Sequence, residues 1–167
     1  MPTTFLEKSG AQRFFIDYPL AAVGHRIGGP AKVSVIASGL FGSISGSAIA
    51  NTVSTGAFTI PMMKKAGFRP HVAGGIEPAA SISGMFMPPI MGAGGFIMAE
   101  LTGVPYSKIM LVAIFPAFMY VFSVFVMVHY EAKMHNIKGE KSEHSATEIL
   151  KTQWPYTLPL IVITIFM

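Results

Sequence analysis

The chain has 167 residues, of which 51% are hydrophobic and only 12% are charged, and its net charge is +4. An ordinary soluble domain carries about 25% charged residues, so this composition indicates an integral membrane protein surrounded by lipid. No basic stripe with interleaved aromatic residues occurs, and we expect no nucleic-acid partner. The absence of cysteine excludes disulfide bonds and thiolate metal ligands.

Residues 1–32 form an N-terminal segment that we expect to lie at the membrane interface. Within it, residues 11–24 are too short to cross a membrane, and Pro19 interrupts them. The pattern predicts a short interfacial or laterally packed helix. A turn rich in glycine and basic residues follows, with Arg26 and Lys32.

Residues 33–63 contain no charged residue and no histidine. As one straight helix they would measure roughly 46 Å, against a hydrocarbon core of about 30 Å. A cluster of glycine and serine at 42–51 lies near the middle of this run, where a spanning helix would be most apolar. Basic residues, which favour the cytoplasm, flank both ends. They are Arg26 and Lys32 before the run and Lys64, Lys65 and Arg69 after it. Length and charge together predict a re-entrant hairpin with its tip near 42–51.

Residues 72–99 are long enough to span, but glycine and proline interrupt them. The pair Pro88 and Pro89 removes two backbone donors and is flanked by Gly84 and Gly92. The pattern predicts a broken transmembrane helix that unwinds at mid-depth.

Residues 109–128 carry no charge and form the clearest predicted transmembrane helix, with a possible kink at Pro116. Residues 129–153 are expected to be a cytoplasmic linker, and 154–167 to begin a transmembrane helix that is too short to cross. We therefore interpret the sequence as a piece of a larger, multi-pass protein of the cytoplasmic membrane. The predicted fold class is all-α, with a re-entrant hairpin and a broken span as half of an inverted-repeat transporter.

Two interrupted elements indicate an ion or substrate site, because irregular backbone in a membrane is tolerated where it is buried or lines a cavity. Helix-end carbonyls can coordinate a cation, and helix-start amides can hold an anion. Hydroxyl and amide oxygens near the tip are hard ligands that suit Na⁺. They belong to Ser43, Ser45, Ser47, Asn51 and Thr55.

Structural explanations compete with this interpretation. The spacing Gly42-x-x-x-Gly46 is typical of close helix packing, and prolines in membrane helices are commonly kinks. Glu77 fits a snorkelling or packing residue better than a proton carrier. His71 and His129 lack metal-ligand spacing. No catalytic motif occurs, so we do not expect an enzyme.

Several ordered motifs resemble the large membrane subunit of tripartite ATP-independent periplasmic (TRAP) transporters. They are most similar to the fused permeases that work with TAXI-type binding proteins. The motifs are Gly28-Gly29-Pro30-Ala31-Lys32-Val33, Gly42-Ser43-Ile44-Ser45-Gly46-Ser47, Glu77-Pro78-Ala79-Ala80-Ser81 and Met87-Pro88-Pro89-Ile90-Met91-Gly92-Ala93.

The resemblance implies a secondary transporter of the bacterial or archaeal inner membrane that is driven by a Na⁺ gradient. It implies no cofactor beyond Na⁺ as coupling ion, a periplasmic substrate-binding protein, a small organic-acid substrate and a second, inverted half of the permease. The implied ion and substrate residues are Ser43, Ser45, Gly46, Ser47, Asn51, Thr55, Gly84, Met87, Pro88, Pro89 and Gly92. Candidates for Na⁺ itself are Ser45, Gly46, Asn51 and Pro88.

Other classes of function remain open at this stage. One is a non-transporting membrane scaffold or degenerate fragment, in which glycines only pack helices and Ser45→Ala would be silent. Another is an ion channel, which would need several such tips in a symmetric ring and would conduct without saturable flux.

Overall fold

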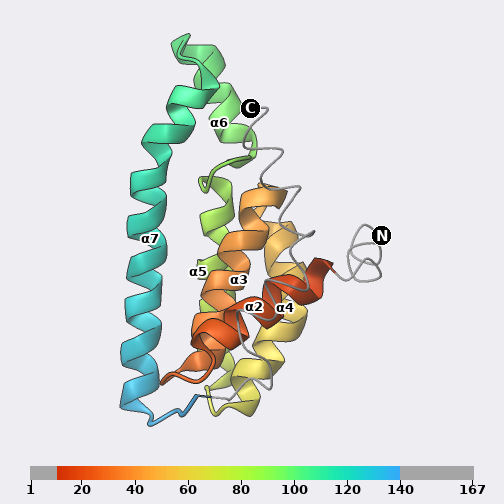
Figure 1. The fold of residues 1–167 in the computed structure, drawn as a ribbon, viewed down its shortest axis with the longest axis vertical. Coiled ribbons are helices and arrows are strands. Elements are labelled where there is room, and N and C mark those ends of the chain that lie inside the picture. The colour runs from red at the N-terminus through yellow and green to blue at the C-terminus, as the bar shows by residue number, and fades with distance from the viewer. Residues whose placement is uncertain (1–10, 140–167) are drawn as a thin grey trace.

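The computed structural model describes residues 11–139, and this part of the chain is helical without any β-strand. Figure 1 shows the helices joined by short turns. They are α2 (Ala11–Val23), α3 (Gly29–Ser45), α4 (Ala48–Lys65), α5 (Pro70–Ile82), the 3-10 turn η1 (Ser83–Met85), α6 (Gly92–Thr102) and α7 (Tyr106–Met134). The predicted all-α class is confirmed for these residues. The predicted segment 154–167 and most of the linker 129–153 lie outside them.

Helices α3 and α4 form a hairpin within the glycine and serine cluster. Helix α3 ends at Ser45 because Gly46 adopts a left-handed φ of 61° and donates its N–H to the Gly42 carbonyl. Ser47 then caps α4, where its Oγ accepts the N–H of Ala50 at 3.3 Å. The chain reverses over these two residues. That the hairpin is re-entrant in a membrane stays a prediction.

The second interrupted element consists of α5, η1 and α6. Helix α5 begins at Pro70, where a missing N–H costs nothing, and it continues through Pro78. After η1, residues 86–91 leave the helical path around Pro88 and Pro89, and α6 resumes at Gly92. We call residues 84–92, which include the last two residues of η1 and the first residue of α6, the broken segment. It lies at the same end of the bundle as the turn between α3 and α4 (Figure 1).

Helix α7 is the longest element and stands at one edge of the bundle (Figure 1). Within its 29 residues, an 18-residue window reaches a mean hydropathy of 2.5, and it is the one helix in the described part that is long and apolar enough to cross a membrane. It contains the predicted span 109–128 and extends beyond it at both ends. Large apolar side chains such as Leu111, Phe115 and Phe118 are exposed along it, as expected for a surface that faces lipid or another protein segment.

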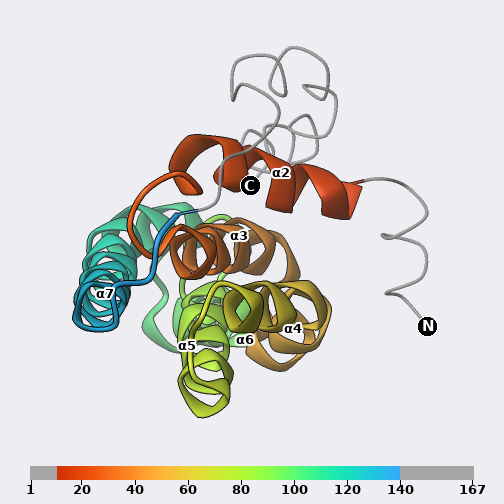
Figure 2. The same cartoon turned by 90° about the horizontal axis from the view of Figure 1, so that it is seen from below.

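The core lies between α3, α4, α5 and α7, which pack side by side in Figure 2. Val35, Met63, Ile76 and Val128 are fully or almost fully buried and each comes from a different one of these helices. On the α5 side, the Tyr120 hydroxyl of α7 also donates to the Ala79 carbonyl at 2.8 Å. These contacts hold the hairpin, α5 and α7 together as one body.

Helix α2 lies across α3 (Figure 2). The expected interruption at Pro19 is wrong, since α2 runs from Ala11 to Val23 with Pro19 inside it. A proline removes one helical hydrogen bond, but its fixed φ is compatible with a helix. The Pro19 ring is fully buried, and this packing offsets the lost bond.

Candidate ion and substrate site

The tip, residues 42–51, is held against the broken segment by two contacts between glycines. A Cβ atom on Gly42 would lie 2.6 Å from the Gly84 Cα, and one on Gly46 would lie 2.9 Å from the Gly92 Cα. Backbone therefore meets backbone at both points, which only glycine permits. Between them, the Ile90 N–H donates to the Ser43 carbonyl at 3.2 Å. The structure thus brings four predicted residues together: Ser43, Gly46, Gly84 and Gly92.

Four helix ends lie around these contacts. Helix α3 and the turn η1 end here, whereas α4 and α6 begin here. The last carbonyls of a helix carry partial negative charge, and its first amides carry partial positive charge. Met91 and Gly92 both have left-handed backbone, with φ of 53° and 56°, so the start of α6 is set by an unusual turn. The arrangement offers carbonyls for a cation and amides for an anion within one region.

The polar side chains of the tip divide into two groups. Ser45 and Ser47 lie on the turn and are half-buried. Asn51 and Thr55 point into the protein and are 0% and 2% exposed. The Asn51 Nδ2 donates to the carbonyls of Ser38 at 2.8 Å and Ser81 at 3.4 Å. Asn51 therefore links α3 to α5 through its amide nitrogen, while its Oδ1 lies 3.4 Å from the hydroxyl oxygen of Thr55.

The proline side of the site borders a small cavity. Met87 and Pro88 line it together with Ser43, and its volume is about 250 Å³. Its other lining residues are apolar or glycine: Val35, Ile36, Gly39, Leu40 and Val121. Pro89 is buried outside this cavity. A charged group has few partners in the cavity itself, so the polar chemistry is confined to the tip.

The residue that the sequence interpretation missed is Glu77 in α5. Its side chain is 0% exposed, which excludes the snorkelling role considered above. Hydroxyl groups surround the carboxylate, and we call them the hydroxyl cluster: Ser34, Ser38, Thr55, Thr59 and Ser81. Ser34 and Thr59 each donate to Oε2 at 2.5 Å, and Ser38 donates to Oε1 at 2.7 Å.

A pattern in the sequence could have revealed this cluster. Ser34 and Ser38 are four residues apart, as are Thr55 and Thr59, and as are Glu77 and Ser81. Residues at this spacing share one face of a helix. Three helices with a polar pair on one face predict a polar contact inside an otherwise apolar bundle. Thr55 was included among the site residues, but the structure places it on Glu77 rather than at the turn.

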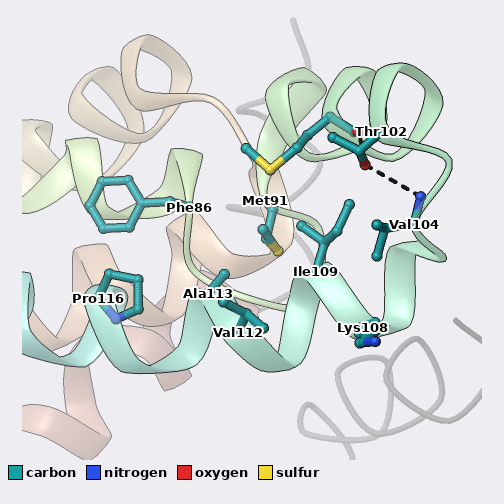
Figure 3. A pocket seen from close by; sticks show the side chains of 10 residues that line it. Phe86, Met91, Thr102, Val104, Lys108, Ile109, Val112, Ala113 and Pro116 are labelled. Atoms are coloured by element: carbon teal, nitrogen blue, oxygen red, sulfur yellow. Dashed lines mark hydrogen bonds between the residues drawn. The ribbon is translucent and has the colours of Figure 1, made fainter.

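A second and larger pocket lies between α6 and α7, next to the broken segment. Figure 3 shows apolar side chains such as Phe86, Met91 and Ile109 around it, and its volume is about 440 Å³. Lys108 is the one charged residue of its lining. The pocket lacks the convergent polar groups of a specific site, and we assign it no role in ion binding.

Tyr106 at the start of α7 fixes the far side of the broken segment. Its hydroxyl oxygen lies 2.8 Å from the Pro89 carbonyl oxygen and 2.6 Å from that of Ile90. The Tyr106 ring also stacks on Phe96, with ring centroids 4.5 Å apart. Helix α7 thus supplies a hydrogen-bond donor to the Pro89 and Ile90 carbonyls, which have no helical partner because the helix is interrupted there.

We expect Tyr106→Phe to lower the free energy of unfolding by about 1 kcal/mol, because it removes this hydrogen bond and keeps the stacked ring. Thermal unfolding of the detergent-solubilised chain would measure the change. Tyr130→Phe, on an exposed position of the same helix, is the control and should have no effect. Equal melting temperatures for wild type and Tyr106→Phe would contradict this account of the broken segment.

The described residues contain no cluster of side chains that typically bind transition metals: no three of His, Cys, Asp and Glu lie close enough to share an ion. Hydroxyl, amide and carbonyl oxygens are the available donors near the tip. Such hard ligands suit alkali cations and not transition metals.

The fold and the site define a class of protein. They combine a helix of membrane-crossing length with two interrupted elements whose helix ends face each other, which is typical of secondary transporters. The chain belongs to the family of the tripartite ATP-independent periplasmic transporter, DctM component, whose family model matches residues 2–167.

Individual relatives agree with this assignment. A Haemophilus influenzae protein provisionally named a TRAP transporter large permease protein is 30% identical over 95% of this chain and 37% of its own length. The 2,3-diketo-L-gulonate TRAP transporter large permease protein YiaN of Escherichia coli is 26% identical over 95% of this chain and 37% of its own length. The C4-dicarboxylate TRAP transporter large permease protein DctM of Vibrio cholerae is 26% identical over 82% of this chain and 30% of its own length.

The chain therefore spans roughly a third of the length of these relatives. The expected large-subunit family is confirmed, whereas the similarity to TAXI-associated fused permeases stays a prediction.

Proposed function

We propose that this chain supplies one half of the ion and substrate site of a TRAP-type secondary transporter in the bacterial inner membrane. In this proposal, Na⁺ moving down its gradient drives the import of an organic acid, which a periplasmic substrate-binding protein delivers. The rest of the permease supplies the facing half of the site.

One observation carries the proposal: the backbone of the tip rests on the backbone of the broken segment. Contacts at Gly42–Gly84 and Gly46–Gly92 place the ends of α3 and η1 beside the starts of α4 and α6. A single region then offers carbonyl oxygens to Na⁺ and helix-start amides to a carboxylate. Membership of the family supports the same function.

The names of two relatives support an acidic substrate. They mention C4-dicarboxylate and 2,3-diketo-L-gulonate, both of which carry carboxylate groups. We assign the carboxylate to the start of α4 near Ser47, because the first amides of a helix attract anions. Na⁺ is assigned to the oxygens of Ser45, Gly46, Asn51 and Pro88.

We expect Ser45→Ala in the complete permease to raise the half-saturating Na⁺ concentration by about threefold to tenfold. The change removes one neutral oxygen ligand, whose loss is comparable to the loss of one hydrogen bond. Uptake of radiolabelled substrate into proteoliposomes, measured across a range of Na⁺ concentrations, gives this value directly.

Ser123→Ala is the matched control, because its hydroxyl is exposed on α7 and donates to the Tyr120 carbonyl. It should leave the Na⁺ dependence unchanged. If Ser45→Ala also left it unchanged, the assignment of Na⁺ to the tip would be refuted, and the packing role of the glycines would become the better explanation.

A further inference from the structure

The carboxylate of Glu77 is bonded to both limbs of the hairpin through each of its two oxygens. Oε2 accepts from Ser34 of α3 and from Thr59 of α4. Oε1 accepts from Ser38 of α3 and from Thr55 of α4. One rigid, planar group therefore bridges the two limbs at two successive helical turns and sets the distance between them.

The backbone leaves room for this group at one position. A Cβ atom on Gly56 of α4 would lie 3.1 Å from the Glu77 Cγ. The missing side chain lets α5 approach α4 closely enough for the carboxylate to reach α3 as well. The spacing of the three helices is thus matched to the length of a glutamate side chain.

The same polar face continues toward the tip. The single hydroxyl proton of Thr55 is shared between the Glu77 carboxyl group and the Asn51 carbonyl, which lies 2.8 Å from the hydroxyl oxygen, and the Asn51 amide donates to the carbonyls of Ser38 and Ser81. One turn beyond Ser38, Gly42 meets Gly84, where a Cβ atom would lie 2.9 Å from the Asn51 Nδ2. A continuous set of contacts therefore joins Glu77 to the point where the tip touches the broken segment.

The burial of Glu77 makes its hydrogen bonds essential. Among the described residues, Glu131 forms an ion pair with Arg69, whereas Glu77 has hydroxyl partners and no Lys or Arg partner. A buried carboxylate is stable only if its lone pairs are occupied. Any separation of α3 from α4 would leave a buried carboxyl oxygen without a donor, so the hydroxyl cluster resists that separation.

We propose that Glu77 is a positioning residue of the tip site: its carboxylate sets the spacing of α3 and α4 and thereby the affinity of the tip for Na⁺ and substrate. The inference rests on the proposed function and adds a residue that lies outside the ion site itself.

The test uses the complete permease in proteoliposomes with its binding protein. The variants are Thr59→Val and Ser34→Ala, which each remove one donor to Oε2, and Glu77→Gln, which keeps the side-chain size. We expect each to raise the half-saturating Na⁺ concentration by about threefold to tenfold, with the maximum uptake rate per folded molecule within about twofold of wild type. A purely structural role would lower the number of folded molecules and leave the half-saturating concentration unchanged.

Thr52→Val is the matched control on α4. Its hydroxyl also donates to the carbonyl four residues earlier, that of Ala48, but it is not one of the hydroxyl groups that donate to Glu77. Since Thr52 is nearer the tip than Thr59, a general weakening of α4 would affect Thr52→Val at least as strongly. We expect wild-type Na⁺ dependence for this control.

Two results separate the proposals. Na⁺ dependence in the wild type, with unchanged half-saturating concentrations in Thr59→Val, Ser34→Ala and Glu77→Gln, would overturn the role of Glu77 alone. Wild-type uptake without Na⁺ dependence would overturn the proposed coupling. In that case the role of Glu77 is tested by the half-saturating substrate concentration instead of that of Na⁺. Variants with the same half-saturating substrate concentration as the wild type would refute the proposal that Glu77 positions the tip. If Glu77→Gln fails to fold, the half-saturating Na⁺ concentration of the milder variant Thr59→Val tests the role of Glu77.

Discussion

Replacing Gly84 with alanine should abolish substrate uptake by the complete permease. The new Cβ atom would lie 2.6 Å from the Cα and 2.9 Å from the carbonyl carbon of Gly42. Both atoms belong to the backbone, so no side chain can rotate away to relieve the overlap. Overpacking of this kind costs about 1–3 kcal/mol even where neighbours can adjust. The tip must therefore move away from the broken segment, and the helix ends that form the site separate.

Gly94→Ala is the control for this experiment. Gly94 also lies in an interrupted element, in α6, but a Cβ atom added there meets no atom within 4 Å. Alanine favours helix over glycine by about 1 kcal/mol, so this variant should transport normally and be at least as stable. Uptake assays with amounts corrected for folded protein would compare the two. Wild-type uptake by Gly84→Ala would show that the contact between Gly42 and Gly84 is not required for function.

Replacing Glu77 with leucine should lower the free energy of unfolding by about 3 kcal/mol. The substitution keeps a similar volume but removes the acceptor of the hydroxyl cluster. Each hydrogen bond contributes about 0.5–1.5 kcal/mol, and donors left buried without an acceptor add a penalty. Part of the loss is recovered, because the Thr55 and Thr59 hydroxyls can turn fully to the carbonyls of Asn51 and Thr55. Thermal or denaturant unfolding of the detergent-solubilised chain would measure the effect.

Glu131→Leu is the comparison for this variant. The Glu131 carboxylate lies 3.1 Å from the Arg69 guanidinium, whose side chain is 54% exposed. An ion pair of this exposure contributes at most about 1 kcal/mol. We expect Glu131→Leu to change stability much less than Glu77→Leu. Equal effects of the two substitutions would show that the hydroxyl cluster adds no more stability than a surface ion pair.

The two predictions concern different levels of the same structure. Gly84 acts where the tip touches the broken segment, whereas Glu77 acts one to two turns deeper, where the limbs are held together. For Gly84→Ala we expect a loss of uptake larger than its stability loss of about 1–3 kcal/mol would explain. For Glu77→Leu we expect loss of stability to be the main effect. Measuring both quantities for both variants therefore separates contact at the site from packing of its support.

The class of the protein and its family could be predicted from the residues and their order. A low charged fraction and long uncharged runs required helices in an apolar setting, because only helices satisfy their own backbone groups there. The glycine at 46 and the serine at 47 carry their turn chemistry locally, and the proline pair at 88 and 89 cannot continue a helix. These features depend on near neighbours in the chain. For that reason they could be predicted without knowledge of the packing.

Which residues contact one another depends on how the helices pack in three dimensions. Gly42 and Gly84 are far apart in the sequence, and their contact depends on how α3 packs against η1. The position of Glu77 near a predicted membrane boundary suggested a snorkelling or packing residue. The packing of α5 between the two limbs excludes snorkelling, because it buries Glu77 among hydroxyl groups from three helices. Pro19 was expected to interrupt α2, but burial of its ring stabilises the helix through that position. Each of these contacts depends on how closely separate segments of the chain approach one another, and this distance cannot be read from the sequence.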